Sequence, residues 1–135
     1  MTLSSFLKMY GVGLATFFAL DLLWLGLVAK DFYQRQIGHL MRPSVQWLPA
    51  VLFYLVFVAA LVVFVAAPAV ERQSVGRAVA FGAFFGFAAY AAFDLTALAL
   101  LRDFPVTVAV VDLAWGAVLS ATVSAAVVLG ARAWG

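Results

Sequence analysis

Three aspartates lie inside long apolar stretches of this sequence, where an ionised carboxylate is costly to keep. Asp21 occurs in FFALDLLWLGL, Asp94 in YAAFDLTALAL and Asp112 in VVDLAWGAV. Ionisable side chains within membrane-crossing segments are rare, and they mark ligand, ion or proton sites by default. Such carboxylates could bind a polar or cationic ligand, pass protons, or act as a paired acid and base in catalysis.

Apolar segments long enough to cross a membrane must hold these aspartates. The chain has 135 residues, of which 67% are hydrophobic and 10% are charged, whereas soluble domains are about 45–50% apolar and about 25% charged. A membrane-crossing helix needs about 20 apolar residues, and four runs reach that length: residues 4–29, 47–67, 77–101 and 105–131. The sequence therefore predicts an all-α, polytopic membrane protein, a bundle of four transmembrane helices forming a single transmembrane domain over residues 1–135.

The order of the spans gives the molecule two faces. Both chain ends and the loop after the second span lie on face A, and the loops at 30–46 and 102–105 lie on face B. The first run is longer than the apolar part of a signal peptide, about 7–15 residues, so we expect a retained helix. All four prolines fall at or near span ends, where proline costs least, so we expect uninterrupted spans. Each face carries four Lys and Arg residues, so the positive-inside rule does not orient the chain.

The three aspartates fall at one predicted depth below face B. Asp21 lies eight residues before the predicted end of its span, Asp94 seven before the end of its own, and Asp112 seven after the start of the fourth. At 1.5 Å per residue, this depth is roughly 10–12 Å. Tyr54, seven residues into the second span, falls in the same layer. Each helix is thus expected to contribute one polar group to a shared intramembrane pocket.

Neighbouring side chains extend the expected site. Tyr90 lies one helical turn before Asp94, and Thr96 lies nearer face B. Trp24 and Trp115 each follow an aspartate by three residues, on the same side of the helix. Because their helices run in opposite directions, we expect Trp24 to form the roof of the pocket and Trp115 its floor. The predicted ligand-binding residues are Asp21, Asp94, Asp112, Tyr54, Tyr90, Trp24, Trp115 and Thr96.

Small residues recur every fourth position on the side of the third and fourth spans that carries the aspartates. Gly82 and Gly86 precede Asp94, and Gly116, Ser120 and Ser124 follow Asp112. Small residues let neighbouring backbones approach closely in membranes, so we expect a bundle closed on face A with the pocket towards face B. A purely structural role for the aspartates, as interhelical hydrogen-bonding groups, remains the alternative.

The first face-B loop, KDFYQRQIGHLMRPSVQ, carries a helical pattern. Its apolar residues Tyr33, Ile37, Leu40 and Met41 fall on one side of a helix. One interpretation is a short interfacial helix lying among lipid headgroups, with its basic residues near phosphates. The other is a lid over a site that opens on face B.

Several kinds of chemistry are excluded or disfavoured. The chain has no cysteine, so it has no disulfide or thiolate metal site. His39, its one histidine, lies in a loop, and Lys8 and Lys30 lie near helix ends. No metal-binding or phosphate-binding motif is present, and the basic residues are too scattered for nucleic acid. We expect no cofactor and no metal; a divalent cation held by the three aspartates and His39 is a minor alternative.

The segments LDLLWLG, FDLTALALLRDFP and VDLAWG together resemble the small bacterial membrane proteins filed as a domain of unknown function, number twenty-one seventy-seven. The resemblance covers nearly the whole chain, and the aspartates of the family pattern map onto Asp21, Asp94 and Asp112. It implies a multi-pass protein of the bacterial inner membrane. It also implies a role beside membrane-lipid metabolism, but no assigned activity.

Three functions follow as hypotheses. The first is a carboxylate-lined intramembrane pocket that binds a small ligand or cation, or passes protons. The second is a non-catalytic accessory subunit of a larger membrane complex or of membrane-lipid modification. The third, an enzyme acting on a lipid, is the least favoured. The expected partners are membrane lipids, a small ligand, and further copies of the chain or a larger membrane complex.

Overall fold

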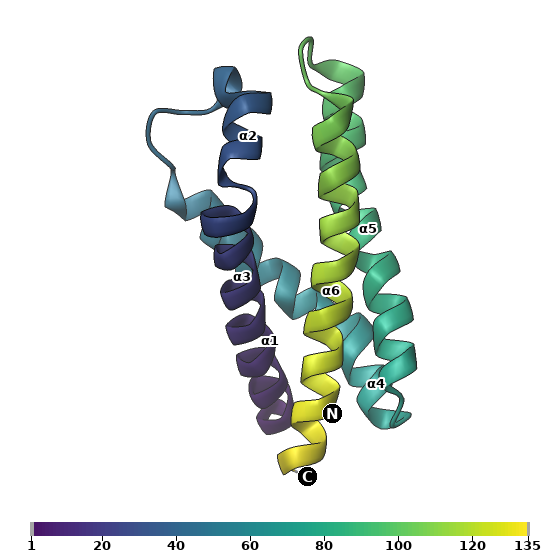
Figure 1. Ribbon diagram of the computed structural model, residues 1–135. Coiled ribbons are helices and arrows are strands. Elements are labelled where there is room, and N and C mark those ends of the chain that lie inside the picture. Colours follow the sequence, from purple (N-terminus) through teal and green to yellow (C-terminus); the bar gives the residue numbers. More distant parts are fainter. Residues whose placement is uncertain (1, 135) are drawn as a thin grey trace.

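Four helices of membrane-spanning length form a bundle in the computed structural model, which describes residues 2–134 (Figure 1). The chain ends lie at one end of the bundle, and the first loop and the turn between the last two helices lie at the other. The predicted all-α, polytopic membrane architecture is thereby confirmed. The four helices comprise Leu3–Val28, Trp47–Glu71, Val75–Leu100 and Val106–Trp134.

Two of these helices contain a π-helical turn, in which hydrogen bonds close over one more residue than in an α-helix. In the first helix, α1 (Leu3–Leu23) is followed by η1 (Trp24–Val28). The second helix consists of α3 (Trp47–Leu61), η3 (Val62–Ala66) and α4 (Ala67–Glu71). The third and fourth helices, α5 (Val75–Leu100) and α6 (Val106–Trp134), are α-helical throughout.

Local sequence explains where the helices begin. The side chain of Thr2 accepts a hydrogen bond from the Ser5 N–H at the start of α1, and Ser74 accepts one from the Arg77 N–H at the start of α5. Such caps satisfy N–H groups that the first turn of a helix leaves unpaired. Pro105 directly precedes α6, a position that suits a residue without an N–H.

The predicted end of the second span is corrected at Pro68. The second span was predicted to end at Ala67, but the helix continues through Pro68 to Glu71. The π-turn η3 changes the hydrogen-bond pattern just before Pro68, since the Ala67 N–H bonds to the Val62 carbonyl. Pro68 consequently lies in the first turn of α4, where its missing N–H costs little.

Close packing of α5 on α6 follows from glycines on both helices, as the small-residue pattern predicted. A Cβ atom on Gly82 would lie 2.8 Å from the Ser120 carbonyl oxygen, and one on Gly86 would overlap the Gly116 carbonyl oxygen. The two backbones can approach only because those Cβ atoms are absent. Ser124, also in this contact, is fully buried.

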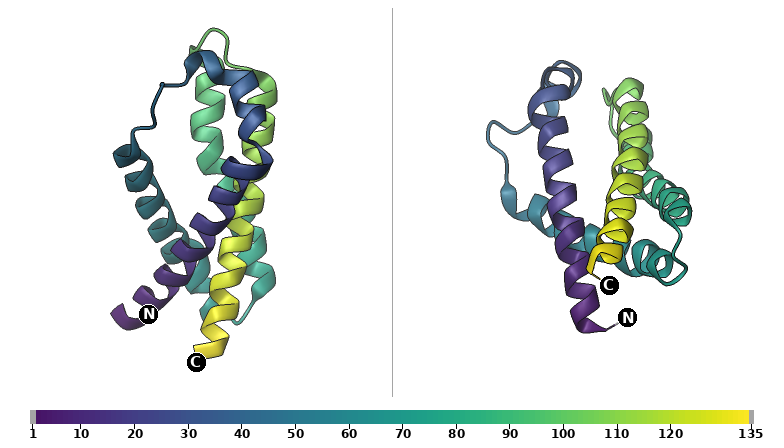
Figure 2. Two further views of the ribbon diagram at one scale, coloured as in Figure 1. Left: turned by 60° about the vertical axis from the view of Figure 1, so that its left-hand side comes forward. Right: turned by 60° about the horizontal axis from the view of Figure 1, so that its bottom comes forward.

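An apolar core fills the face-A half of the bundle. Side chains from three helices meet in it and are almost completely buried. They include Phe17 from α1, Val58 and Leu61 from α3, and Leu119 and Val123 from α6. Towards face B, α3 diverges from α5, and Figure 2 shows the two helices apart there. The bundle is therefore tightly packed at one end and spread at the other.

The first face-B loop folds into α2 (Lys30–Ile37) and a short 3-10 turn, η2 (Gly38–Leu40). The apolar side of α2 does not face outward, because Phe32, Tyr33 and Ile37 pack against the face-B ends of α5 and α6. The predicted amphipathic pattern is shorter than expected, since the α-helix ends at Ile37 and Leu40 is exposed.

Candidate functional site

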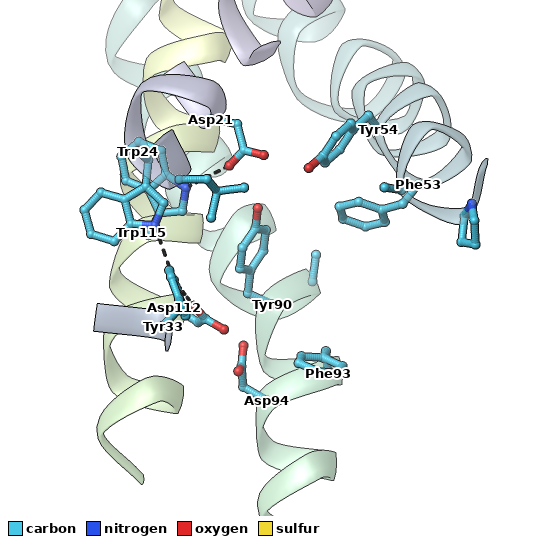
Figure 3. Close-up of a pocket in the computed structure, with 14 residues that line it drawn as sticks. Asp21, Trp24, Tyr33, Phe53, Tyr54, Tyr90, Phe93, Asp94, Asp112 and Trp115 are labelled. Carbon is cyan, nitrogen blue, oxygen red and sulfur yellow. Dashed lines mark hydrogen bonds between the residues drawn. The ribbon is translucent and has the colours of Figure 1, made fainter. Parts of the chain in front are cut away.

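A cavity of about 770 Å³ lies in the face-B half of the bundle, where α3 diverges from α5. All four membrane helices and α2 contribute to it, and Figure 3 shows its side chains. The three intramembrane aspartates converge on this one space from three helices. Its lining residues are Asp21, Trp24, Leu25, Tyr33, Pro49, Ala50, Phe53, Tyr54, Ala89, Tyr90, Phe93, Asp94, Asp112 and Trp115.

Asp94 is the least exposed of the polar residues that line the pocket. Its side chain is 1% exposed, and within residues 2–134 neither of its carboxylate oxygens has a hydrogen-bond partner. It points towards Asp112 on the neighbouring helix (Figure 3). Two carboxylates that face each other away from water require a shared proton or a cation between them.

Trp24 and Trp115 stack on each other instead of forming a roof and a floor. Their ring centroids are 4.5 Å apart and their planes differ by 9°. The indole N–H of Trp115 donates a hydrogen bond to Oδ1 of Asp21, at 3.4 Å. The expectation that the two indoles lie above and below a chamber is therefore wrong: they form a single wall of the pocket.

This stack also corrects the expectation of a single depth for the aspartates. Trp24 lies three residues beyond Asp21 towards face B, whereas Trp115 lies three residues beyond Asp112 towards face A. Because the two indoles lie at one level, Asp21 must be deeper than Asp112, by about 9 Å along the helices. Figure 3 shows the two aspartates on opposite sides of the stacked indoles, with Asp94 on the side of Asp112.

Tyr33 joins the site from outside the membrane helices. Its hydroxyl donates a hydrogen bond to Oδ1 of Asp112 and accepts one from the indole N–H of Trp24, at 3.3 Å. Burial raises the pKa of the Tyr33 hydroxyl above its ordinary value, and the hydrogen bond to Asp112 raises it further. The hydroxyl is therefore a persistent proton donor to Asp112.

Sequence reasoning left Tyr33 out of the site. The apolar side of the predicted loop helix includes Tyr33 and could have indicated it, because that side suggested a lid over the site. In the structure, α2 packs against the face-B ends of α5 and α6 and places Tyr33 in the pocket wall, against Asp112. Because Tyr33 contacts a helix far away in the sequence, spacing alone could not place it.

Tyr54 and Tyr90 lie at the deeper end of the pocket, with Asp21. Figure 3 shows both hydroxyls directed to the same space as the Asp21 carboxylate. The ring of Tyr54 packs against Phe17, with centroids 5.1 Å apart, so the apolar core holds it from below. The pocket thus has two polar ends, one at Asp21 and one at Asp94 and Asp112.

Thr96 does not belong to the pocket. Its side chain is exposed, and it is not among the described residues that line the cavity. Two residues along a helix turn a side chain by about 200°, so Thr96 faces away from the side that carries Asp94. Phe93 and Phe53, which sequence reasoning did not select, line the pocket beside Asp94 and Tyr54.

The arrangement does not resemble a metal centre. Among the described residues, no group of three or more His, Asp or Glu side chains could hold a metal ion. His39, the residue invoked for a divalent-cation site, is exposed in η2.

Four apolar helices with a buried carboxylate pocket define a small multi-pass integral membrane protein. The family described as "Predicted membrane protein (DUF2177)" matches residues 6–129, and the chain belongs to that family. The predicted resemblance is thus confirmed, and the family description assigns no activity. Curated proteins and solved structures give no match to this chain.

Proposed function

We propose that the pocket binds a small ligand that carries a positive charge. The observation that carries this proposal is Asp94, a buried carboxylate that lines the cavity and whose oxygens have no hydrogen-bond partner among residues 2–134. A buried group left in that state costs free energy unless a partner satisfies it. A bound cation supplies that partner.

The charge of the pocket favours a cation over an anion. Three carboxylates line it, and no lysine or arginine is among its described lining residues. An anion would meet like charge in a medium of low dielectric constant, where repulsion is strong.

The lining favours an organic cation over a metal ion. Aromatic rings contribute much of the surface, including the stacked indoles and the rings of Phe53, Tyr54, Tyr90 and Phe93. Aromatic rings beside carboxylates are typical of sites that recognise organic ammonium groups, which are attracted to the faces of the rings. A cavity of about 770 Å³ also has room for such a molecule.

Binding is favoured over passage of protons or ions through the protein. Between the pocket and face A, the buried core residues are apolar, including Phe17, Leu61 and Leu119. Ser120 and Ser124 are the buried polar side chains of that half among residues 2–134, and they lie in the glycine contact of α5 with α6. Few polar side chains are therefore available to carry protons or ions from the pocket to face A.

The cellular setting is part of the same proposal. We place the protein in the inner membrane of a bacterium. Its resemblance to small bacterial membrane proteins, which implies a role beside membrane-lipid metabolism, supports this setting. If binding proves absent, the accessory-subunit hypothesis becomes the preferred one.

Binding of tetramethylammonium tests the proposal. The purified protein, held in micelles of an uncharged maltoside detergent, is dialysed to equilibrium against radiolabelled tetramethylammonium. We expect saturable binding that weakens about tenfold or more in Asp94→Asn, which corresponds to at least about 1.4 kcal/mol. The matched control is Asp103→Asn, which removes an exposed aspartate of the face-B turn and should leave binding unchanged.

Two results would contradict the proposal. One is binding that does not saturate in the wild-type protein. The other is equal binding by wild type, Asp94→Asn and Asp103→Asn, since the pocket carboxylate would then have no part in it.

A further inference from the structure

The pocket is closed on its face-A side. Directly below Asp21 and Tyr54, the rings of Phe17 and Phe57 pack at a centroid distance of 5.8 Å, and Phe17 is fully buried. The close contact of α5 with α6 continues the seal towards face A. A ligand of the size of the pocket has no path through this half.

On the face-B side, the helix α2 borders the pocket. Phe32 and Ile37 pack against the ends of α5 and α6, and the Tyr33 hydroxyl donates a hydrogen bond to Asp112. A ligand that approaches the aspartates from the water at face B therefore meets a packed helix.

The remaining side lies between α3 and α5. Pro49 and Phe53 of α3 and Phe93 of α5 line the pocket there and are themselves exposed, Phe53 by 45% and Phe93 by 62%. Figure 3 shows Phe53 and Phe93 on the two helices that border this side. In a membrane-spanning bundle, a gap between two apolar helix surfaces faces lipid tails and not water.

We propose that the ligand is an amphiphile that enters sideways from the bilayer. Its cationic head lies against Asp94 and Asp112, and its apolar tail passes out between Phe53 and Phe93 among the lipid tails. This inference rests on the proposed function, because it needs a cation at the aspartates.

The energetics of this pose are favourable at both ends of the ligand. Asp94 lies six residues before the end of α5 at Leu100, so the head sits about 9 Å below that end. Moving a cation to that depth costs several kcal/mol without a partner, and facing carboxylates offset this cost. The tail stays in hydrocarbon throughout and loses no hydrophobic stabilisation.

The experiment locates the tail by fluorescence quenching. The chain has no cysteine, so single cysteines can be labelled with bimane without background. Ala50→Cys and Phe93→Cys place the label on the two borders of the gap. Val110→Cys places it on an exposed part of α6 that does not line the pocket. The probe is dodecyltrimethylammonium with a bromine on the last tail carbon, and bromine quenches bimane on contact.

We expect loss of fluorescence at positions 50 and 93 that saturates with probe concentration and is reversed by excess tetramethylammonium. At position 110, the loss should only rise linearly, as the probe partitions into the micelle. Asp94→Asn should abolish the saturable part at position 50.

Two failures are distinguishable. If tetramethylammonium binds in an Asp94-dependent manner but quenching rises linearly at all three positions, lateral entry of an amphiphile is wrong while the cation pocket stands. If neither tetramethylammonium nor the brominated probe shows Asp94-dependent binding, the proposed function fails and this inference fails with it.

Discussion

Tyr33 shows how one side chain of a loop completes an intramembrane site. Its hydroxyl links the indole of Trp24 to the carboxylate of Asp112, and so connects the first and fourth membrane helices through α2. A hydrogen bond to a charged group away from water is stronger than a neutral one. The position of α2 over the pocket therefore depends on this hydroxyl as well as on apolar packing.

Tyr33→Phe removes the hydroxyl and keeps the ring. We expect unfolding stability in detergent to fall by about 1–2 kcal/mol, measured by thermal unfolding followed through tryptophan fluorescence. Because the folded-state pKa of Tyr33 is raised above the ordinary 10.0, the stability that its hydroxyl contributes is fully present well below pH 10 and is lost as the pH rises from there through the raised pKa. The stability difference should therefore be the same at about pH 6 and about pH 8 and should shrink above about pH 10.

The comparison variant is Tyr10→Phe, which removes a hydroxyl that donates to the Leu55 carbonyl in the face-A half. It loses one hydrogen bond but leaves the pocket intact, so tetramethylammonium binding should change only in Tyr33→Phe. Equal effects of the two variants on binding would show that Tyr33 has no special relation to the site.

For single residues, the sequence predicted which polar side chains of the membrane helices belong to the site better than it predicted the side chains that they contact. Asp21, Asp94 and Asp112 could be selected because a carboxylate in an apolar run is unusual whatever the packing. The stacking of Trp24 on Trp115 could not, because it depends on how far one helix is shifted along the other. Thr96 was misplaced because its depth was considered without its direction around the helix.

Among the elements, the α5–α6 pair forms the most closely packed contact of the bundle. Gly86 and Gly116 oppose each other there, and a Cβ atom on Gly116 would lie 2.6 Å from the ring of Tyr90. Tyr90 and Asp94 project from α5 directly above this contact. The separation of the two helices at the pocket is consequently fixed by the glycines one and two turns below it.

Gly86→Ala should be strongly destabilising, because the added methyl group would overlap the backbone of α6. We expect a loss of about 3 kcal/mol, measured by thermal unfolding in detergent. Gly11→Ala is the matched control, since a Cβ atom there meets no other atom within 4 Å. It should be neutral or stabilise α1 by up to about 1 kcal/mol. Equal stability of the two variants would mean that α5 and α6 are not in close contact.

The extent of the elements was predictable and their internal irregularities were not. The first helix was expected over residues 4–29 and comprises Leu3–Val28, because the length of an apolar run limits a membrane helix directly. The π-turns η1 and η3 leave no comparable pattern, since Leu, Val and Phe suit both kinds of turn. Pro68 was expected to mark the end of the second span, whereas it lies in the first turn of α4, just after the π-turn η3.

The molecule as a whole is packed at face A and spread at face B. Its chain ends lie together at the packed end, and α2 and the Arg102–Pro105 turn lie at the spread end (Figures 1 and 2). The equal number of basic residues on the two faces left the direction in the membrane open. Four crossings nevertheless determine which loops and chain ends lie on the same side of the membrane.

Labelling with a membrane-impermeant maleimide on intact cells tests this arrangement. Ser4→Cys and Arg72→Cys lie at the packed end, and Arg35→Cys and Asp103→Cys lie at the spread end; all four positions are exposed. We expect the first two to react from one side of the membrane and the last two from the other. Reaction of Ser4→Cys and Asp103→Cys from the same side would contradict the four-crossing fold.

The π-turn η1 makes the pocket sensitive to the length of the chain. In η1 the Ala29 N–H bonds to the Trp24 carbonyl, five residues back, so this turn contains one residue more than an α-helical turn. One residue corresponds to a rotation of about 100° around a helix. Deleting any single residue between Trp24 and Val28 would restore a regular helix and turn Tyr33 away from Asp112. This segment should therefore tolerate exchanges of one apolar residue for another, but not insertions or deletions.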